Sequence, residues 1–213
     1  MALIYHITHI DNLPGILRED GLWCDAERLR RGLLVQSIAY QELKERRSGR
    51  SVETLDGQPV AAGGELADYV PFYFANRSPM LYAIHTGYVE GYTGGQTEVV
   101  YLVSSVERVV EMGPQWCFTD GHAVEALTDF FASLDDLSRV DWTVVEHWSW
   151  RNRVNDLDRK RRKQAEFLVH QFLPWDAVES IAVMTSAMAN RVSNVIAGSA
   201  PQTPVKVERS WYY

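Results

Sequence analysis

The sequence predicts an α+β fold, and three observations favour this class. Strand-like segments and short helices mix along the 213 residues without the strand–helix–strand alternation of a doubly wound parallel sheet. No repeat period is visible in the sequence. Neither a GxGxxG nor a GxxxxGK[ST] motif is present, so a Rossmann dinucleotide site and a P-loop are both unsupported. We expect residues 1–213 to form one domain, because no linker is long enough to demand a boundary.

The N-terminal segments predict one strand and two helices. Residues 3–8 are rich in β-branched and aromatic side chains, which favours a strand. Asp11 and the asparagine after it offer N-cap oxygens for a short helix with an apolar face over 13–17, and Gly21 ends it. Residues 38–47 form a second candidate helix that ends near the next glycine.

The middle of the chain predicts a loop, a strand and a helix. Three glycines, Gly57, Gly63 and Gly64, together with Pro59 indicate a surface loop over 53–65. The aromatic segment 69–74 is typical of a strand, in which Pro71 indicates an edge position or a bulge. Ser78 precedes a proline, the pattern of an N-cap followed by proline at the first helical position, which predicts a helix over 79–85.

The second half is a mixture of short elements around one long polar excursion, residues 141–163. The continuous apolar run over residues 99–103 predicts a buried strand. The predicted strands are Val99–Val103, Trp116–Thr119, Phe167–Phe172, Ile181–Met184 and Val205–Trp211. The predicted helices are Val106–Met112, Ala123–Leu134 and Ala187–Ile196.

Composition restricts the possible function classes. Hydrophobic residues make up 46% and charged residues 23%, which excludes wholesale disorder. No apolar run reaches the roughly 18 residues of a membrane helix, and the N-terminus does not resemble a signal peptide. Cys24 and Cys117 stand alone without a CxxC pair, so we expect a cytoplasmic protein with neither a disulfide framework nor a membrane partner.

The charge balance directs any nucleic-acid contact to a local patch. There are 21 lysines and arginines against 28 acidic residues, a net charge of −7, whereas generic polyanion binders are usually basic. One candidate patch is the five-residue basic run 159–163 with Arg151 and Arg153 before it, and a second lies between Lys44 and Arg50. A basic run is most often a solvated face. Seven tryptophans and ten tyrosines offer rings for base stacking, although such rings are more often core.

Several polar side chains are candidates for chemistry. In the first strand His6 and Thr8 point to one face, where they would meet a ligand or simply be satisfied within the fold. The hydroxyl and free N–H groups at Ser78 suit an amide or an anion, and Tyr73 and Tyr82 would sandwich a flat ring; ordinary strand-to-helix packing is the alternative.

Two further clusters contain acids and a histidine. Glu166 heads an apolar strand directly after the basic run, and nearby cations would favour its ionised form. Asp120-Gly121-His122 reads either as an acid–base pair or as a turn cap. A serine hydrolase is not supported, since there is no GxSxG motif, and His6 with His9 makes a poor zinc site.

In this order the clusters resemble those of ADP-ribosyltransferases, and within them the DarT family. The resemblance covers nearly the whole chain. It is carried by Tyr5-His6-Ile7-Thr8-His9, Glu45-Arg46-Arg47, Asp68 to Phe74 with Arg77-Ser78-Pro79-Met80-Leu81-Tyr82, Asp120-Gly121-His122, and Gln164 to Val169. It implies a split, mixed or antiparallel sheet with peripheral short helices that binds NAD in an extended cleft. DarT proteins are bacterial toxins that ADP-ribosylate thymine in single-stranded DNA within a short sequence motif, and the antitoxin DarG removes the mark with a macrodomain.

The resemblance also implies the roles of individual residues. Glu166 would stabilise the ribose cation as nicotinamide leaves, Arg47 would stabilise the thymine anion with Arg46 as the alternative, and His122 would line the DNA side. Whether Glu166 also takes the thymine proton stays open. The implied cofactor-binding residues are His6, Thr8, Gly15, Arg46, Tyr73, Ser78, Met80 and Tyr82. The implied DNA-binding residues are Arg50, Arg77, Trp148, Trp150, Arg151, Arg153, Arg159, Lys160, Arg162 and Lys163.

No metal is required by this chemistry, and we expect a monomer in a bacterial cytoplasm. Two alternatives stay open: an enzyme of the same fold that acts on protein or RNA, and a non-catalytic nucleic-acid-binding module. Alanine at position 166 is expected to abolish modification without unfolding the chain, because a carboxylate at a strand start is not expected in the core.

Overall fold

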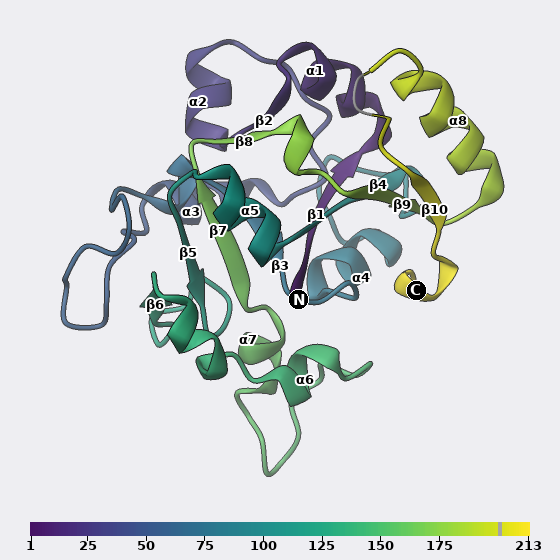
Figure 1. Cartoon of the computed structure of the whole chain (residues 1–213). Helices are drawn as coiled ribbons and strands as arrows, with labels where there is room; N and C mark the ends of the chain where they lie inside the picture. The colour runs from purple at the N-terminus through teal and green to yellow at the C-terminus, as the bar shows by residue number, and fades with distance from the viewer. Residues whose placement is uncertain (200–201) are drawn as a thin grey trace.

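The computed structural model describes residues 1–199 and 202–213, which fold around an eight-stranded, mostly antiparallel sheet (Figure 1). The strand order is β10-β9-β4-β1-β3-β7-β5-β6, and the β10–β9 pair is parallel. Strands β2 and β8 form a separate antiparallel pair. Short helices lie around the sheet, so the predicted α+β class is confirmed.

The strands are β1 (Leu3–His9), β2 (Gly21–Trp23), β3 (Tyr69–Tyr73), β4 (Val99–Ser105), β5 (Trp116–Thr119), β6 (Phe130–Phe131), β7 (Glu166–His170), β8 (Phe172–Pro174), β9 (Ser180–Val183) and β10 (Val205–Val207). The α-helices are α1 (Leu13–Arg18), α2 (Asp25–Arg30), α3 (Gln41–Ser48), α4 (Pro79–His85), α5 (Val106–Met112), α6 (Trp142–Glu146), α7 (Arg159–Lys163) and α8 (Ser186–Ile196). The 3₁₀ helices are η1 (Ile10–Asn12), η2 (Leu66–Asp68), η3 (Leu134–Arg139), η4 (Trp175–Ala177) and η5 (Arg209–Trp211).

The sheet opens between β1 and β3. Strand β1 pairs with β4 along its whole length, but its pairing with β3 is confined to Tyr5 and Tyr73. On its other side β3 pairs with β7 over five residues. The sheet is therefore continuous at one end of this junction and open at the other, which creates space between two strands that both carry predicted site residues.

Pro71 lies in an interior strand, so the edge position predicted for it is wrong. Its neighbours Val70 and Phe72 point their N–H groups at β7, as the bond from the Phe74 N–H to the Ala165 carbonyl indicates by alternation. The Pro71 nitrogen therefore faces β1, where the strands have separated. A missing N–H has no cost there, because no ladder carbonyl stands opposite.

Alternation along the strands buries both faces of the sheet. One face contributes Ile4, Phe72 and Leu102 to the main core, and the other contributes Tyr5 and Tyr101 to a second cluster. Every residue of β4 is buried, as the apolar run over 99–103 predicts. Of the described residues, no helix has both the length and the hydrophobicity needed to cross a bilayer.

Most predicted elements are confirmed, and one is wrong. Ser78 caps α4 through its hydroxyl with proline at the first position, and α5 has the predicted bounds. The helix predicted over 123–134 is instead a pair of turns, the short strand β6 and the start of η3. The final predicted strand, 205–211, stops at Val207 and continues as a 3₁₀ turn.

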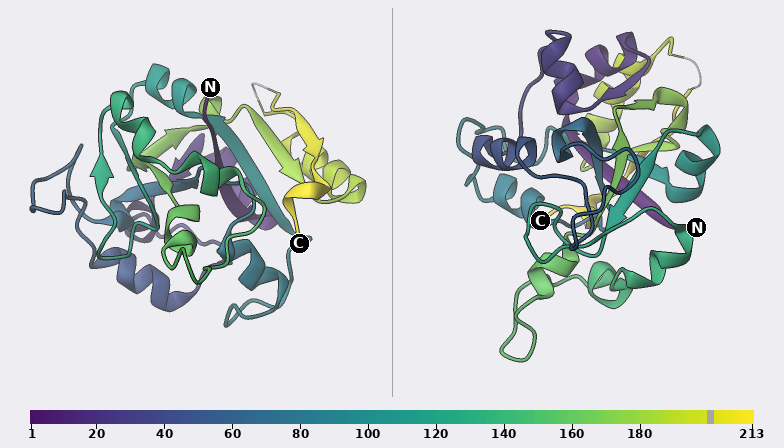
Figure 2. Two further views of the ribbon diagram at one scale, coloured as in Figure 1. Left: turned by 90° about the horizontal axis from the view of Figure 1, so that it is seen from below. Right: turned by 90° about the vertical axis from the view of Figure 1, so that its left-hand side faces the viewer.

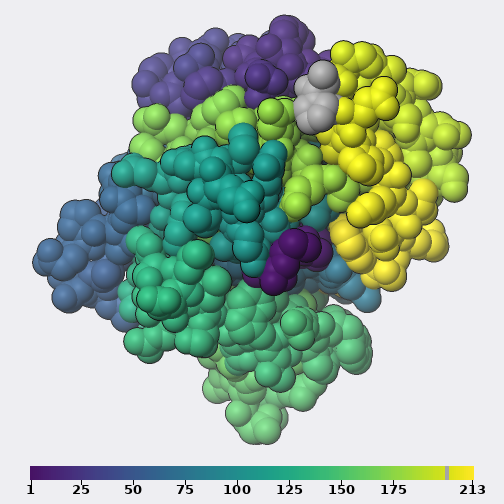
Figure 3. Space-filling model, in the orientation of Figure 1, coloured from purple at the N-terminus to yellow at the C-terminus, as the bar shows by residue number. Residues whose placement is uncertain are grey.

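The excursion before β7 projects from the body of the molecule. Helices α6 and α7 and the loop between them lie together at the bottom of Figure 1, and the right-hand view of Figure 2 shows the loop reaching beyond the sheet. In the space-filling view this segment forms the green lower protrusion (Figure 3). The excursion therefore extends into solvent and ends just before Glu166, the first residue of β7.

Candidate active site

Glu166 occupies the centre of the site. It is the first residue of β7 and is only 2% exposed. Its Oε2 accepts a hydrogen bond from Arg47 Nη1 at 2.9 Å, and its Oε1 accepts one from the Ala123 N–H at 3.0 Å. The expectation that position 166 lies outside the core is therefore wrong. Alanine there would leave a buried guanidinium and a buried N–H without their acceptor.

Arg47 approaches Glu166 from the last turn of α3, 119 residues earlier in the chain. Its side chain is 11% exposed, and its Nη2 is buried without a hydrogen-bond partner among the described residues. A buried donor without a partner costs free energy unless a ligand satisfies it, so Nη2 is available to a bound carbonyl or anion. Arg46 instead contacts Glu125 and the Val124 carbonyl. Of the two arginines, Arg47 reaches the carboxylate.

His122 completes this group from the turn after β5. Its Nε2 lies 4.0 Å from Glu166 Oε1. Burial lowers the pKa of His122, and the positive charge of Arg47 lowers it further against the opposing effect of Glu166. The imidazole is therefore neutral near pH 7 and able to accept a proton.

The opening between β1 and β3 brings four of the predicted cofactor residues together. His6 Nδ1 lies 2.8 Å from the Pro71 carbonyl, which assigns the proton to Nδ1 and leaves Nε2 as an acceptor. Burial lowers the pKa of His6, so the ring is neutral. Thr8 accepts from Asn12, and the Tyr73 hydroxyl donates to the Met80 sulfur at 3.8 Å. All four side chains line the same cavity as Glu166.

The cavity that contains Glu166 is the first of two grooves that adjoin each other. The first, about 180 Å³, contains His6, Arg47 and Glu166, and it adjoins a further hollow of about 340 Å³ that Gly15 lines. The second, about 710 Å³, contains Arg46 and Lys160. The first and second grooves share four wall residues, which are Leu43, Tyr73, Met80 and His122. Two ligands, one in each groove, would therefore meet beside His122 and Glu166.

Ser78 and Tyr82 lie outside this cavity, which corrects their predicted contact with a nicotinamide ring. Ser78 is 1% exposed, and its hydroxyl accepts from the Leu81 N–H as the cap of α4. Tyr82 packs edge-on against Trp150 and Tyr213. Both residues therefore fix the position of α4, which presents Met80 to the cavity. Tyr73 lines the cavity and Tyr82 does not.

The basic run 159–163 is not the solvated face that its composition predicts. Lys163 is 2% exposed and donates to the carbonyls of Val145 and His147, the latter at 2.7 Å. Arg159 is 6% exposed and donates to the Ser149 carbonyl at 3.1 Å. Neither side chain has the exposure that a phosphate contact needs. Both instead stabilise the excursion from within, which corrects their assignment to DNA.

Other predicted DNA-binding residues divide into partnered and exposed groups. Arg162 pairs with Asp141 and Asp156, and the Trp150 indole donates to the Tyr213 hydroxyl at 2.9 Å. The guanidinium of Arg50 lies over Phe130 and that of Arg77 over Tyr213, each with a buried Nε that lacks a partner among the described residues. The exposed members of the set are Trp148, Arg151, Arg153 and Lys160.

The sequence analysis missed the far wall of the first groove. Arg28 and Asp25 form an ion pair there at 2.7 Å, and the Asn12 amide is bonded in both directions to the backbone of Gln36. The segment 35–39 forms the rest of this wall. No clear periodicity marks residues 25–37 in the sequence, because this wall is made by the short helix α2 and by a loop that gains its shape from tertiary contacts. In the part of the chain that the structure describes, no cluster of three or more His, Cys, Asp or Glu side chains suits a metal ion.

The buried position of Lys163 makes the stability of the protein depend on pH in alkaline solution. Desolvation lowers the pKa of Lys163 to about 8, whereas the unfolded chain keeps the ordinary value near 10.5. Between these values the unfolded state binds the extra proton, so the free energy of unfolding rises with pH. Relative to Lys163→Met, the free energy of unfolding of the wild type should therefore rise by about 1–2 kcal/mol from pH 8 to pH 10, after allowance for solvent screening.

Urea unfolding followed by tryptophan fluorescence at several pH values measures this difference. Lys160→Met is the matched control, since Lys160 is exposed on the same helix, and it should keep the pH dependence of the wild type. An equal pH dependence in the wild type and Lys163→Met would contradict a buried, readily deprotonated amine.

Comparisons with known proteins agree with this geometry. Residues 5–213 match a protein-family model described as "ssDNA thymidine ADP-ribosyltransferase, DarT". The chain is 41% identical over 214 residues to a DNA ADP-ribosyl transferase of Thermus aquaticus, covering 100% of this chain and 89% of that protein. It is 25% identical over 195 residues to a Thermosipho africanus fusion of a DNA ADP-ribosyl transferase with a DNA ADP-ribosyl glycohydrolase, covering 91% of this chain and 45% of that protein.

Solved structures give the same result. The DarT of Thermus sp. 2.9 in complex with ADP-ribosylated single-stranded DNA superposes with a TM-score of 0.90 at 39% identity, covering 100% of this chain and 96% of that one. The same Thermus protein in complex with NAD⁺ gives a TM-score of 0.87 at 37% identity, with 100% and 98% coverage.

Proposed function

The chain belongs to the DarT family of NAD-dependent, single-stranded DNA ADP-ribosyltransferases, and from this premise we propose that it modifies thymine bases within a short sequence motif as the toxin of a toxin–antitoxin pair. The observation that carries the proposal is the meeting of two grooves at His122, whose Nε2 lies 4.0 Å from the carboxylate of the buried Arg47–Glu166 pair in the first groove. The Thermus relative binds NAD⁺ and ADP-ribosylated single-stranded DNA. We assign NAD to the first groove and the DNA strand to the second, with residues 1–213 acting as one monomeric catalytic domain in the bacterial cytoplasm.

In the first groove, neutral His6 and the half-buried Tyr73 supply fixed hydrogen-bonding groups at the opening of the sheet. Both keep their neutral forms near pH 7, because burial lowers the pKa of His6 and raises that of Tyr73. Glu166 lines the same groove. We propose that the nicotinamide riboside lies between these side chains, with its ribose against the Glu166 carboxylate.

The reaction breaks the bond between ribose C1′ and the nicotinamide nitrogen. Nicotinamide leaves with the electron pair, and positive charge develops on the ribose. The Glu166 carboxylate stabilises that charge at short range in a site with little water. Its two hydrogen bonds, from Arg47 and from the Ala123 N–H, hold the carboxylate in place before the reaction begins. C1′ then bonds to the thymine N3, and the proton of N3 passes to a neighbouring side chain of the protein.

Arg47 and His122 act on the thymine side of this reaction. Thymine N3 is the only ring nitrogen of thymidine that carries a proton, and its loss leaves negative charge on the two ring carbonyls. The free Nη2 of Arg47 is placed to stabilise that charge, and neutral His122 stands where the second groove enters. Of the residues predicted to hold the strand, exposed Lys160 lines this groove, and Trp148 offers an exposed ring for stacking.

A direct assay tests the proposed acceptor. The protein is incubated with NAD and single-stranded oligonucleotides, and the products are weighed by mass spectrometry. We expect the mass of one ADP-ribosyl group on thymine-containing strands and none on matched strands in which every thymine is cytosine. Equal modification of both strands would exclude thymine as the target, and preferential labelling of RNA or protein would favour the alternative acceptors.

The toxin role rests on the family and on the Thermosipho relative, in which transferase and glycohydrolase are fused. We expect induced expression of this chain to arrest bacterial growth. Co-expression of a DNA ADP-ribosyl glycohydrolase of the DarG macrodomain type should restore growth, because it removes the mark. Arrest that persists beside an active glycohydrolase would contradict DNA modification as the toxic event.

A further inference from the structure

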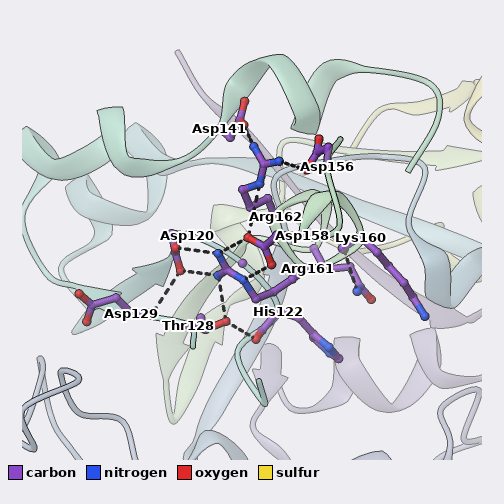
Figure 4. A network of polar contacts seen from close by, with 12 residues as sticks. Asp120, His122, Thr128, Asp129, Asp141, Asp156, Asp158, Lys160, Arg161 and Arg162 are labelled. Carbon is purple, nitrogen blue, oxygen red and sulfur yellow. Dashed lines mark hydrogen bonds and ion pairs between the residues drawn. The ribbon is translucent and has the colours of Figure 1, made fainter. Parts of the chain in front are cut away.

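We propose that Arg161 is a positioning residue for the transfer reaction, because it clamps the turn over residues 120–123 against the catalytic carboxylate. This inference rests on the proposed function of Glu166 and adds a residue outside the two reacting groups. In the sequence, nothing distinguishes Arg161 from the other residues of the basic run. The structure gives it a separate environment from its neighbours, since it turns inward between α7 and the loop after β5 (Figure 4).

The guanidinium of Arg161 is fixed on both sides. It donates to both carboxylate oxygens of Asp120, at 2.9 and 3.2 Å, and to the Thr128 hydroxyl at 3.2 Å. Its other edge donates to both oxygens of Asp158 at 2.8 Å. The side chain is 15% exposed, so these bonds are only weakly screened by water. A planar guanidinium held by two carboxylates has little freedom to rotate.

The backbone of His122 is held by the same cluster. The His122 N–H donates to the Arg161 carbonyl at 2.9 Å. The His122 carbonyl accepts from the Thr128 hydroxyl at 2.8 Å, and that hydroxyl is itself a partner of Arg161. Both main-chain polar groups of His122 are therefore fixed, and Figure 4 shows the imidazole pointing away from the Arg161 guanidinium.

Gly121 makes the close approach of Arg161 possible. A Cβ at position 121 would lie 2.3 Å from Arg161 Nη1 and 2.9 Å from its Cγ, which is closer than atoms can pack. In the Asp-Gly-His sequence, the aspartate accepts hydrogen bonds from the guanidinium, the glycine leaves room for it, and the histidine lines the site. This accounts for all three residues of a motif that the sequence leaves open between catalysis and a turn cap.

The clamp reaches Glu166 through the next residue of the turn. The Ala123 N–H donates to Glu166 Oε1, so any shift of the turn withdraws one of the two bonds that orient the carboxylate. Thr119 links the same parts again, since its hydroxyl donates to the Gly121 carbonyl and accepts from the Glu166 N–H. Arg161 precedes Glu166 by five residues. The segment that carries the carboxylate therefore also binds, through Arg161, the turn whose N–H orients that carboxylate. A displacement of about 1 Å in such a site costs up to about 100-fold in rate.

Steady-state kinetics of Arg161→Gln with NAD and a thymine-containing oligonucleotide test this role. We expect kcat to fall about tenfold or more, with the KM for NAD within about twofold of the wild type, because Arg161 lines the second groove and not the cofactor groove. Arg191→Gln is the matched control. Arg191 also pairs with two carboxylates, those of Glu98 and Asp11, but it lies on α8 away from the grooves, so both constants should stay within about twofold.

Asp120→Asn is a second variant, in which Arg161 keeps its contacts with Asp158. It tests the same role if Arg161→Gln does not fold. It should lower kcat in the same direction, and the double variant should lose no more than Arg161→Gln alone, because both changes open one clamp. Fully additive losses, a kcat equal to that of Arg191→Gln, or a raised KM at unchanged kcat would each overturn the inference. An inactive wild type would instead overturn the proposed function itself.

Discussion

Replacing Glu166 by glutamine should lower the rate of ADP-ribose transfer to DNA by about 10³-fold while the protein stays folded. The amide has nearly the shape of the carboxylate and keeps an oxygen for the Ala123 N–H, but it carries no charge to stabilise the ribose cation. Oligonucleotide modification followed over time by mass spectrometry measures the loss. Glutamine is a better test than alanine, because the buried position makes alanine remove two hydrogen bonds as well as the charge.

Glu107→Gln is the control for this variant, since Glu107 is a half-exposed carboxylate on α5 that pairs with the N-terminal amine. It should keep the activity of the wild type within about twofold. A Glu166→Gln protein that melts within a few degrees of the wild type and still modifies DNA at more than a tenth of its rate would show that the carboxylate is not the catalytic group.

Replacing Arg47 by lysine should lower transfer about 100-fold and leave NAD affinity within about threefold. Lysine keeps a positive charge beside Glu166 but lacks the planar fork, so it cannot bind the carboxylate and a thymine carbonyl together. Isothermal titration with NAD gives the affinity, and oligonucleotide modification gives the rate. An equal loss of both would assign Arg47 to the cofactor instead of the DNA.

Arg46→Lys is the neighbouring comparison that the structure provides. Arg46 lies on the same helix but contacts Glu125 and a carbonyl of the outer turn at 3.4 Å, away from Glu166. Its loss of transfer should be at least ten times smaller than that of Arg47→Lys. The reverse order of effects would mean that α3 presents the other arginine to the reacting base.

Local patterns predicted much of the fold because they act within a few residues. The N-cap and proline at positions 78 and 79 specify the start of α4, and the apolar run 99–103 specifies a strand buried on both faces. The helix predicted over 123–134 is wrong for a physical reason. Its apolar side chains have helical spacing, but Phe130 and Phe131 lie in β6 paired to β5, and Leu127 is 77% exposed. Pairing of Phe130 and Phe131 with the preceding strand overrides the periodicity.

The charges of α7 show the same limit more clearly. From the sequence, five consecutive basic residues predict a surface for phosphates. In the structure, Lys163 and Arg159 satisfy backbone carbonyls, while Arg161 and Arg162 neutralise aspartates from other parts of the chain. An excess of acidic residues makes such internal pairing available, but the sequence does not say which acid lies near which base. Of the run, Lys160 is the exposed residue that lines the second groove.

The sequence by itself determined the family, the α+β class and the strands that carry His6, Tyr73 and Glu166, because these depend on motifs and periodicities contained in short segments. Only the tertiary structure decided that Arg47 reaches Glu166, that Ser78 and Tyr82 support α4 instead of touching ligand, and that Arg161 holds the His122 turn. The physical reason is distance along the chain. Arg47 and Glu166 are 119 residues apart, and the packing of the sheet brings their charged atoms to 2.9 Å.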